Sequence, residues 1–181
     1  LGIFVAADMV TVYLLLALLS VGTTGLVMQT GTLRSLRAGA IYIGMALLAE
    51  SLLLVGFVLI VNSAAGNTLL VADAPAAIVA SPWRDAIFAL LIAGFGIKAG
   101  LVPLHFWIPL AHGAAPVPAS ALLSGAVVKA SVIGLIRFLP LDNAPWATGA
   151  ALAAVGLFGA LYSVAIGITQ RGPIDKASSG T

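Results

Sequence analysis

Five long runs of apolar residues, separated by shorter polar and turn-forming stretches, divide this chain of 181 residues. They cover approximately residues 8–29, 37–62, 83–110, 117–138 and 146–169. A helix needs roughly 20 apolar residues to cross a bilayer core of about 30 Å, and each run has that length. The pattern therefore predicts an all-α polytopic membrane protein with about five transmembrane helices, forming a single bundle over residues 1–181.

The third run contains a residue that interrupts a helix. Pro103 has no backbone N–H, and its ring clashes with the carbonyl group four residues earlier. We expect the helix to break between Gly100 and His105. Backbone groups freed at this depth need protein or water as partners, so the break also predicts a small wet cavity beside Lys98.

The stretches between the runs carry helix breakers and most of the basic residues. Residues 63–82 contain glycine, aspartate and proline breakers, with a short interfacial helix expected at 74–80. If all five runs span, Arg34, Arg37, Arg171 and Lys176 lie at one membrane face, and Arg84 and Arg137 lie at the other. Because basic residues are enriched in cytoplasmic loops, this bias predicts a cytoplasmic first loop and an outward-facing amino end.

Composition supports a membrane protein and excludes several other classes. Hydrophobic residues make up 61% of the chain and charged residues 8%, against about 25% charged residues in soluble domains. The formal charge of +2 comes from few residues and forms no nucleic-acid-binding patch. The absence of cysteine excludes disulfides, iron–sulfur clusters and cysteine-ligated zinc, and the two histidines lack metal-ligand spacing, so we expect no cofactor and no metal. Nothing resembles a nucleophile–base pair or a phosphate-binding loop, so an enzyme with its own catalytic centre is not indicated.

Three ionisable residues lie near the middle of successive apolar runs: Glu50, Lys98 and Lys129. A charged side chain at the centre of a membrane helix costs about 2.5–3.5 kcal/mol on insertion scales, so such residues usually face a bundle interior or a water-filled path. One interpretation is a structural ion pair or triad that locks three helices together. The other is a proton relay, in which burial and mutual fields allow the groups to exchange protons.

Two histidines follow Lys98 in the third run. His105 lies beside the expected break and is the natural next proton carrier, because imidazole titrates near neutrality. The alternative for His105 is a buried histidine with a hydrogen-bond partner. His112 lies near the expected membrane edge and is a second candidate for the same path.

The segment after Lys98 carries a motif, Pro-Leu-His-Phe-Trp-Ile-Pro-Leu-Ala-His, at residues 103–112. A lysine in a broken helix followed by this motif resembles the antiporter-like membrane subunits of complex I (NADH-quinone oxidoreductase), of energy-converting and formate-linked hydrogenases, and of multisubunit cation/proton antiporters. The resemblance covers nearly the whole chain and implies a fragment of the larger antiporter-like fold. It also implies other membrane subunits as partners, protons or possibly sodium as the transported ion, and a bacterial or archaeal cytoplasmic membrane.

One departure from the family pattern concerns the acid that partners the central lysine. The family has a tryptophan–glutamate pair in its corresponding helix, where this chain has Leu16 and Ala17. Glu50, in the neighbouring helix, is expected to substitute for the missing glutamate.

Three functions remain open from the sequence. The first is a proton-translocating subunit of a redox-driven complex, of the NADH-quinone oxidoreductase or membrane-bound hydrogenase type, with Lys98, Lys129, Glu50, His105 and His112 as relay residues. The second is a component of a multisubunit cation/proton antiporter. The third is a non-pumping scaffold subunit, in which the lost glutamate marks lost pumping.

Overall fold

The computed structural model describes residues 2–64, 66, 68–140 and 146–169, and these residues form helices joined by short loops. Arg171 and Lys176, which entered the orientation argument, lie outside the described residues. The elements are α1 (Gly2–Val5), α2 (Met9–Met28), α3 (Leu33–Ser63), the 3₁₀ turn η2 (Val71–Asp73), α4 (Ala74–Ala80), α5 (Arg84–Ala99), the 3₁₀ turn η3 (Leu104–Phe106), α6 (Trp107–Ala114), α7 (Val117–Leu122), the π-turn η4 (Leu123–Val127), α8 (Val128–Phe138) and α9 (Trp146–Thr169).

The helical elements confirm the predicted all-α membrane fold. Among the described residues, four spans are long and apolar enough to cross a membrane: Met9–Met28, Leu33–Ser63, Arg84–Ala114 and Val117–Phe138. The fifth predicted run corresponds to α9, a helix of 24 residues. The short helix expected at residues 74–80 is α4.

Capping residues explain where the first two long helices begin. The Asp8 side chain accepts a hydrogen bond from the backbone N–H of Thr11 at 2.7 Å, which satisfies one of the free donors at the start of α2. The hydroxyl of Thr32 accepts from the backbone N–H of Ser35 at 3.1 Å and caps α3 in the same way. The polar turn between α2 and α3 thus ends one span and starts the next.

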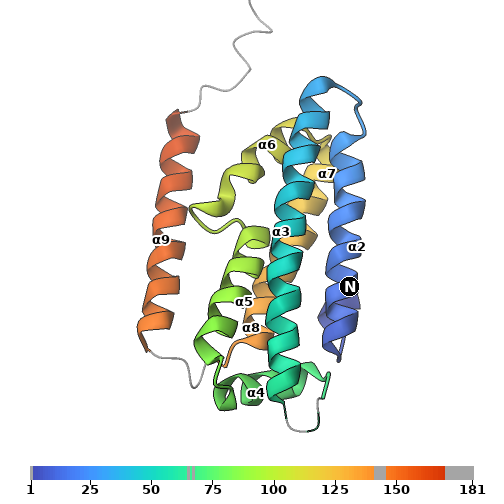
Figure 1. Cartoon of the computed structure of the whole chain (residues 1–181). Coiled ribbons are helices and arrows are strands. Elements are labelled where there is room, and N and C mark those ends of the chain that lie inside the picture. Colours follow the sequence, from blue (N-terminus) through green and yellow to red (C-terminus); the bar gives the residue numbers. More distant parts are fainter. Residues whose placement is uncertain (1, 65, 67, 141–145, 170–181) are drawn as a thin grey trace, which may run out of the picture.

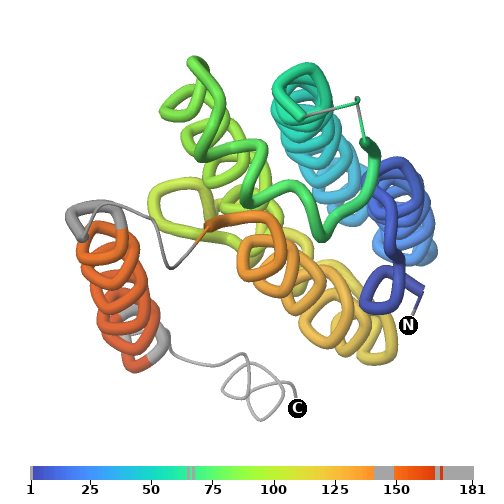
Figure 2. Tube along the Cα trace, turned by 90° about the horizontal axis from the view of Figure 1, so that it is seen from below, coloured from blue at the N-terminus to red at the C-terminus, as the bar shows by residue number. Residues whose placement is uncertain are grey.

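The helices α2, α3, α5 and α8 lie side by side, and α9 lies at the edge of the group (Figures 1 and 2). α3 packs against α2, α5 and α6, while α5 also packs against α8. Three phenylalanines from α3, α5 and α8 meet in the core: the ring centroids of Phe57 and Phe138 are 4.7 Å apart, and those of Phe95 and Phe138 are 5.9 Å apart. Gly134 permits this approach, because a Cβ atom there would overlap the Phe95 ring.

The arginines lie at opposite ends of the bundle. Arg34 and Arg37 are in the first turns of α3, at the upper end of Figure 1, whereas α5 begins with Arg84 and α8 ends near Arg137 at the lower end. The Arg137 guanidinium donates hydrogen bonds to the carbonyl oxygens of Ile3 (3.2 Å) and Ala6 (2.7 Å), so it ties α8 to the end of α1. Which end faces the cytoplasm stays a prediction.

Candidate functional site

The break in the third span lies where the proline predicted it. α5 ends at Ala99, and Gly100 adopts the left-handed conformation with φ of 77°. The N–H of Gly100 bonds the carbonyl of Ile97 at 3.2 Å, and the N–H of Leu101 bonds the carbonyl of Gly96 at 2.8 Å. This Schellman arrangement satisfies carbonyl groups that the end of the helix would otherwise leave free.

Trp107 completes the hydrogen bonding at the break. Its indole N–H donates to the carbonyl oxygen of Ile97 at 2.8 Å, and the side chain is buried. The indole ring also packs on Tyr42 of α3, with ring centroids 5.2 Å apart. Trp107 therefore connects the end of α5, the start of α6 and the first third of α3.

Lys98 and Glu50 form a buried ion pair. The Nζ atom of Lys98, in the last turn of α5, lies 2.7 Å from the Oε1 atom of Glu50 on α3, and both residues are at most 5% exposed. The negative end of the α5 dipole adds a second favourable interaction for the ammonium group. Removal of either partner would destabilise the protein, because the other would remain as a buried charge without compensation.

Ser20 of α2 is the third member of this site. The Lys98 ammonium donates to the Ser20 hydroxyl oxygen at 2.6 Å, and the same hydroxyl lies 3.3 Å from the Oε1 atom of Glu50. The sequence reasoning missed Ser20. A usable signal was present, because Ser20, Thr23 and Thr24 follow the helical spacing of three and four residues and so place hydroxyl groups on one face of an otherwise apolar helix.

A small cavity of about 10 Å³ lies beside Lys98 and has about the room that one water molecule requires. Ser20, Tyr42 and Trp107 are among the residues that line it. The Tyr42 hydroxyl hydrogen-bonds the Thr23 hydroxyl at 2.6 Å, which extends the chain of polar groups along α2. The cavity agrees with the prediction that the broken helix makes room for a polar path.

Lys129 does not join the ion pair. It is exposed on α8, two residues after the π-turn η4, and has no hydrogen bond or ion pair within the part of the chain that the structure describes. The expected common depth of Lys98 and Lys129 in the membrane is therefore not accompanied by direct contact.

The two histidines occupy different surroundings. His105 is half-buried in η3, and its ring packs edge-on against Tyr162 of α9, with ring centroids 5.3 Å apart. Its Nδ1 atom is buried without a hydrogen-bond partner among the described residues. The Nδ1 atom of His112 hydrogen-bonds the hydroxyl of Ser120 at 2.5 Å, which joins α6 to α7.

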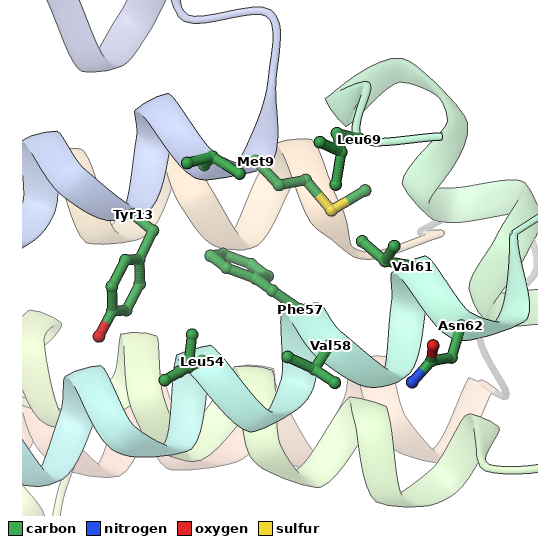
Figure 3. Close-up of a pocket in the computed structure, with 9 residues that line it drawn as sticks. Met9, Tyr13, Leu54, Phe57, Val58, Val61, Asn62 and Leu69 are labelled. Atoms are coloured by element: carbon green, nitrogen blue, oxygen red, sulfur yellow. The ribbon is translucent and has the colours of Figure 1, made fainter. Parts of the chain in front are cut away.

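A wider groove between α2 and α3 has a different character. It has a volume of about 250 Å³ and a mainly apolar lining. In Figure 3, Met9 of α2 lies beside Phe57 and Val61 of α3, and Asn62 contributes an amide at one end of the groove. Lys98 and Glu50 are not among its lining residues, so the groove is separate from the charged site.

Comparison with known proteins identifies the family. Residues 6–172 match the family model described as "NADH:quinone oxidoreductase/Mrp antiporter, TM". The chain belongs to this family. The resemblance drawn from Lys98 and the motif at residues 103–112 is thereby confirmed, and the chain is part of a multi-pass, antiporter-like membrane subunit.

Relatives in the NADH:quinone oxidoreductase/Mrp antiporter family are much longer than this chain. An uncharacterized protein of Mycobacterium tuberculosis is 42% identical over 163 residues, which cover 88% of this chain and 25% of the relative. Hydrogenase-4 component B of Escherichia coli is 31% identical over 161 residues, which cover 87% of this chain and 24% of the relative. The chain thus spans about a quarter of the length of these relatives and corresponds, as expected, to a fragment of the larger fold.

Two solved assemblies contain chains with the same helix arrangement. A chain of the Mrp complex from Dietzia sp. DQ12-45-1b has a TM-score of 0.67 at 25% identity, covering 78% of this chain and 27% of that one. A chain of the membrane-bound sulfane sulfur reductase, an archaeal respiratory membrane complex, has a TM-score of 0.66 at 26% identity, covering 77% and 29%. These relatives are therefore parts of multisubunit membrane complexes.

Proposed function

We propose that this chain carries a proton-translocation site of an antiporter-like subunit, with Lys98 as the central carrier and Glu50 as its counter-ion. The observation that carries the proposal is the buried Lys98–Glu50 pair, which lies beside a helix break in the middle of a membrane span. Polar groups at such a depth are costly and mark ion pathways in membrane proteins.

The pair provides a simple way to hold and release a proton. While Glu50 is within 2.7 Å, the carboxylate compensates the charge of the ammonium group. If a change elsewhere in the complex separates the two groups, the ammonium is left without compensation in a region of low dielectric. A buried charge in that situation becomes neutral, which for lysine means loss of the proton. The cavity beside Lys98 offers space for a water molecule to receive that proton.

His105, His112 and Lys129 are proposed as further carriers. His105 lies in the break itself, and His112 lies further along the same span, near its end. Lys129 is exposed within the span Val117–Phe138, so in the membrane its ammonium group requires protein or water beside it.

We propose a redox-driven complex of the hydrogenase or NADH-quinone oxidoreductase type as the setting, in a bacterial or archaeal cytoplasmic membrane. The name of Hydrogenase-4 component B supports this choice. A second candidate is a component of a cation/proton antiporter, favoured by the structural similarity to a chain of the Mrp complex. The departure at Ala17 keeps a non-pumping scaffold as a third candidate.

Lys98→Met tests the translocation proposal. The variant is introduced into the complete subunit within its assembled complex, and proton uptake is measured in proteoliposomes. We expect translocation to fall to background while assembly persists, because methionine fills a similar volume without the charge. Lys129→Met removes the same chemistry from an exposed position and is expected to weaken translocation only partly. Normal uptake by Lys98→Met would leave the scaffold as the better proposal.

A further inference from the structure

The Ser20 hydroxyl contacts both charged groups of the buried pair. Its oxygen lies 2.6 Å from the Nζ atom of Lys98 and 3.3 Å from the Oε1 atom of Glu50. It also lies 2.9 Å from the carbonyl oxygen of Leu16, one turn earlier in α2. A hydroxyl has one hydrogen to donate, so Ser20 can donate either to the Leu16 carbonyl oxygen or to Glu50 Oε1, but not to both at once.

We propose that Ser20 is a positioning residue that transfers its hydrogen-bond donation from Leu16 to Glu50 when Lys98 loses its proton. This inference rests on the proposed function and names a residue that holds the counter-ion in its charged form. The change requires rotation of the O–H bond about the Cβ–Oγ bond, since both acceptors are already within hydrogen-bond distance.

The ammonium group determines which acceptor the hydroxyl serves. With Lys98 charged, Glu50 Oε1 receives a charge-assisted hydrogen bond at 2.7 Å from the ammonium group. Of its two acceptors, the Ser20 hydroxyl then lies closer to the Leu16 carbonyl oxygen (2.9 Å) than to Glu50 Oε1 (3.3 Å). With Lys98 neutral, the carboxylate is the strongest acceptor near the hydroxyl. Ser20 and Lys98 are the only donors to Glu50 within the part of the chain that the structure describes, and Oε2 has no partner there.

Other hydroxyl groups in these helices show what a purely local role looks like. Ser131 of α8 is completely buried and donates to the carbonyl of Val127 at 2.8 Å, the common arrangement for serine in an apolar helix. It has no hydrogen bond to a charged group within the described residues. Ser20 has the same local bond and, in addition, both members of the ion pair. Ser131→Ala is therefore a matched control.

The remaining ionisable groups near Glu50 do not compete for this role. Tyr13 of α2 and Tyr42 of α3 carry phenol groups, which ordinarily stay protonated near neutral pH. Asp8 caps the start of α2, and α4 carries no ionisable side chain. Arg84 and Asp85 begin α5, at the opposite end of the helix from Lys98. His112, in the last turn of α6, hydrogen-bonds Ser120 of α7.

The first test uses Lys98→Met as a permanent stand-in for lysine without its proton. In the complete subunit within its complex, infrared spectroscopy follows the carboxylate and carboxylic acid bands of Glu50, identified as those that Glu50→Gln removes. Adding Ser20→Ala should move the midpoint of Glu50 protonation upward by about one pH unit, because a hydrogen bond to the charged form is lost. Ser131→Ala in the same background should leave the midpoint where it was.

The second test measures proton uptake with Lys98 intact. We expect Ser20→Ala to slow translocation roughly tenfold, the factor that corresponds to one such hydrogen bond. Ser20→Thr, which keeps the hydroxyl, should restore most of the rate, and Ser131→Ala should match the unmodified protein.

The two tests separate the inference from the proposed function. An unchanged Glu50 midpoint after Ser20→Ala would overturn the role of Ser20, whatever the transport rates. Normal transport by Lys98→Met together with a shifted midpoint would overturn the translocation proposal and leave the hydrogen-bonding role of Ser20 intact.

Discussion

Glu50 occupies the place beside Lys98 that the family resemblance assigns to a residue on the preceding helix. The resemblance places the partner glutamate at position 17 of α2, where this chain has alanine. The structure brings Glu50 of α3 to the same lysine at 2.7 Å, and α2 contributes the Ser20 hydroxyl instead. The carboxylate beside Lys98 thus comes from α3, whereas the resemblance implies one from α2.

Glu50→Gln tests whether this replacement carries the function. Removal of one partner of a buried pair typically costs about 3–5 kcal/mol unless the survivor becomes neutral, so Lys98 should lose its proton permanently. We expect proton uptake in proteoliposomes to fail about as completely as with Lys98→Met, and Ala17→Glu in the same protein to restore part of it. Ser51→Ala, which removes an exposed hydroxyl next to Glu50 in sequence, is the control. Normal uptake by Glu50→Gln would contradict the replacement.

At this scale the sequence predicted the charged residues and missed the neutral one. Few charges occur in the apolar runs, so burial required Glu50 and Lys98 to find partners, and the pair is confirmed. Ser20 was missed because serine in a membrane helix ordinarily satisfies itself on its own backbone. The exposure of Lys129 also did not follow from the sequence, because it depends on how α8 is turned about its axis.

The broken span α5–α6 shows what a helix requires in order to stop inside a membrane. Pro103 predicted the interruption, and the predicted limits agree with the structure. The sequence did not predict how the free carbonyl groups are satisfied. Gly100 adopts the left-handed conformation, and Trp107 donates a hydrogen bond to the Ile97 carbonyl. Both depend on contacts between residues on opposite sides of the break.

Gly100→Ala is expected to destabilise the broken span. A left-handed conformation costs a residue with a side chain about 1–2 kcal/mol, and the new Cβ atom would also overlap Ile108. The melting temperature of the detergent-solubilised complex should fall, and the transport rate should fall with it. Gly44→Ala is the control, because Gly44 lies in α3 with open space around it and alanine favours a helix. Equal melting temperatures for the two variants would show that the break tolerates a side chain at position 100.

At the scale of the whole molecule, apolar run lengths predicted the helices, and the positions of the arginines between the runs predicted which of them share an end of the bundle. The four spans follow the runs closely because each needs a minimum apolar length. The position of α9 at the edge of the group could not be inferred, since its apolar surface has no pattern that selects a neighbour. The orientation in the membrane likewise rests on the arginines.

Cysteine labelling tests that orientation. Thr32→Cys lies at the α2–α3 turn near Arg34, and Ala76→Cys lies in α4 at the other end of the bundle, both at exposed positions. A membrane-impermeant reagent applied to intact cells should label Ala76→Cys, while Thr32→Cys should react only after the membrane is opened. The reverse pattern would invert the assignment, because the excess of basic residues belongs on the cytoplasmic side.

The π-turn at Leu123–Val127 determines the direction in which the later side chains of the fourth span point around the helix axis. An α-helix advances about 100° per residue, and a π-turn takes one additional residue into a single turn. Conversion of this turn to regular α-helix would therefore rotate Lys129 by about 100° around the axis of α8 with little movement along it. The direction in which this lysine points is thus fixed by local winding two residues earlier, and a swivel of α8 would redirect the charge without moving it through the membrane.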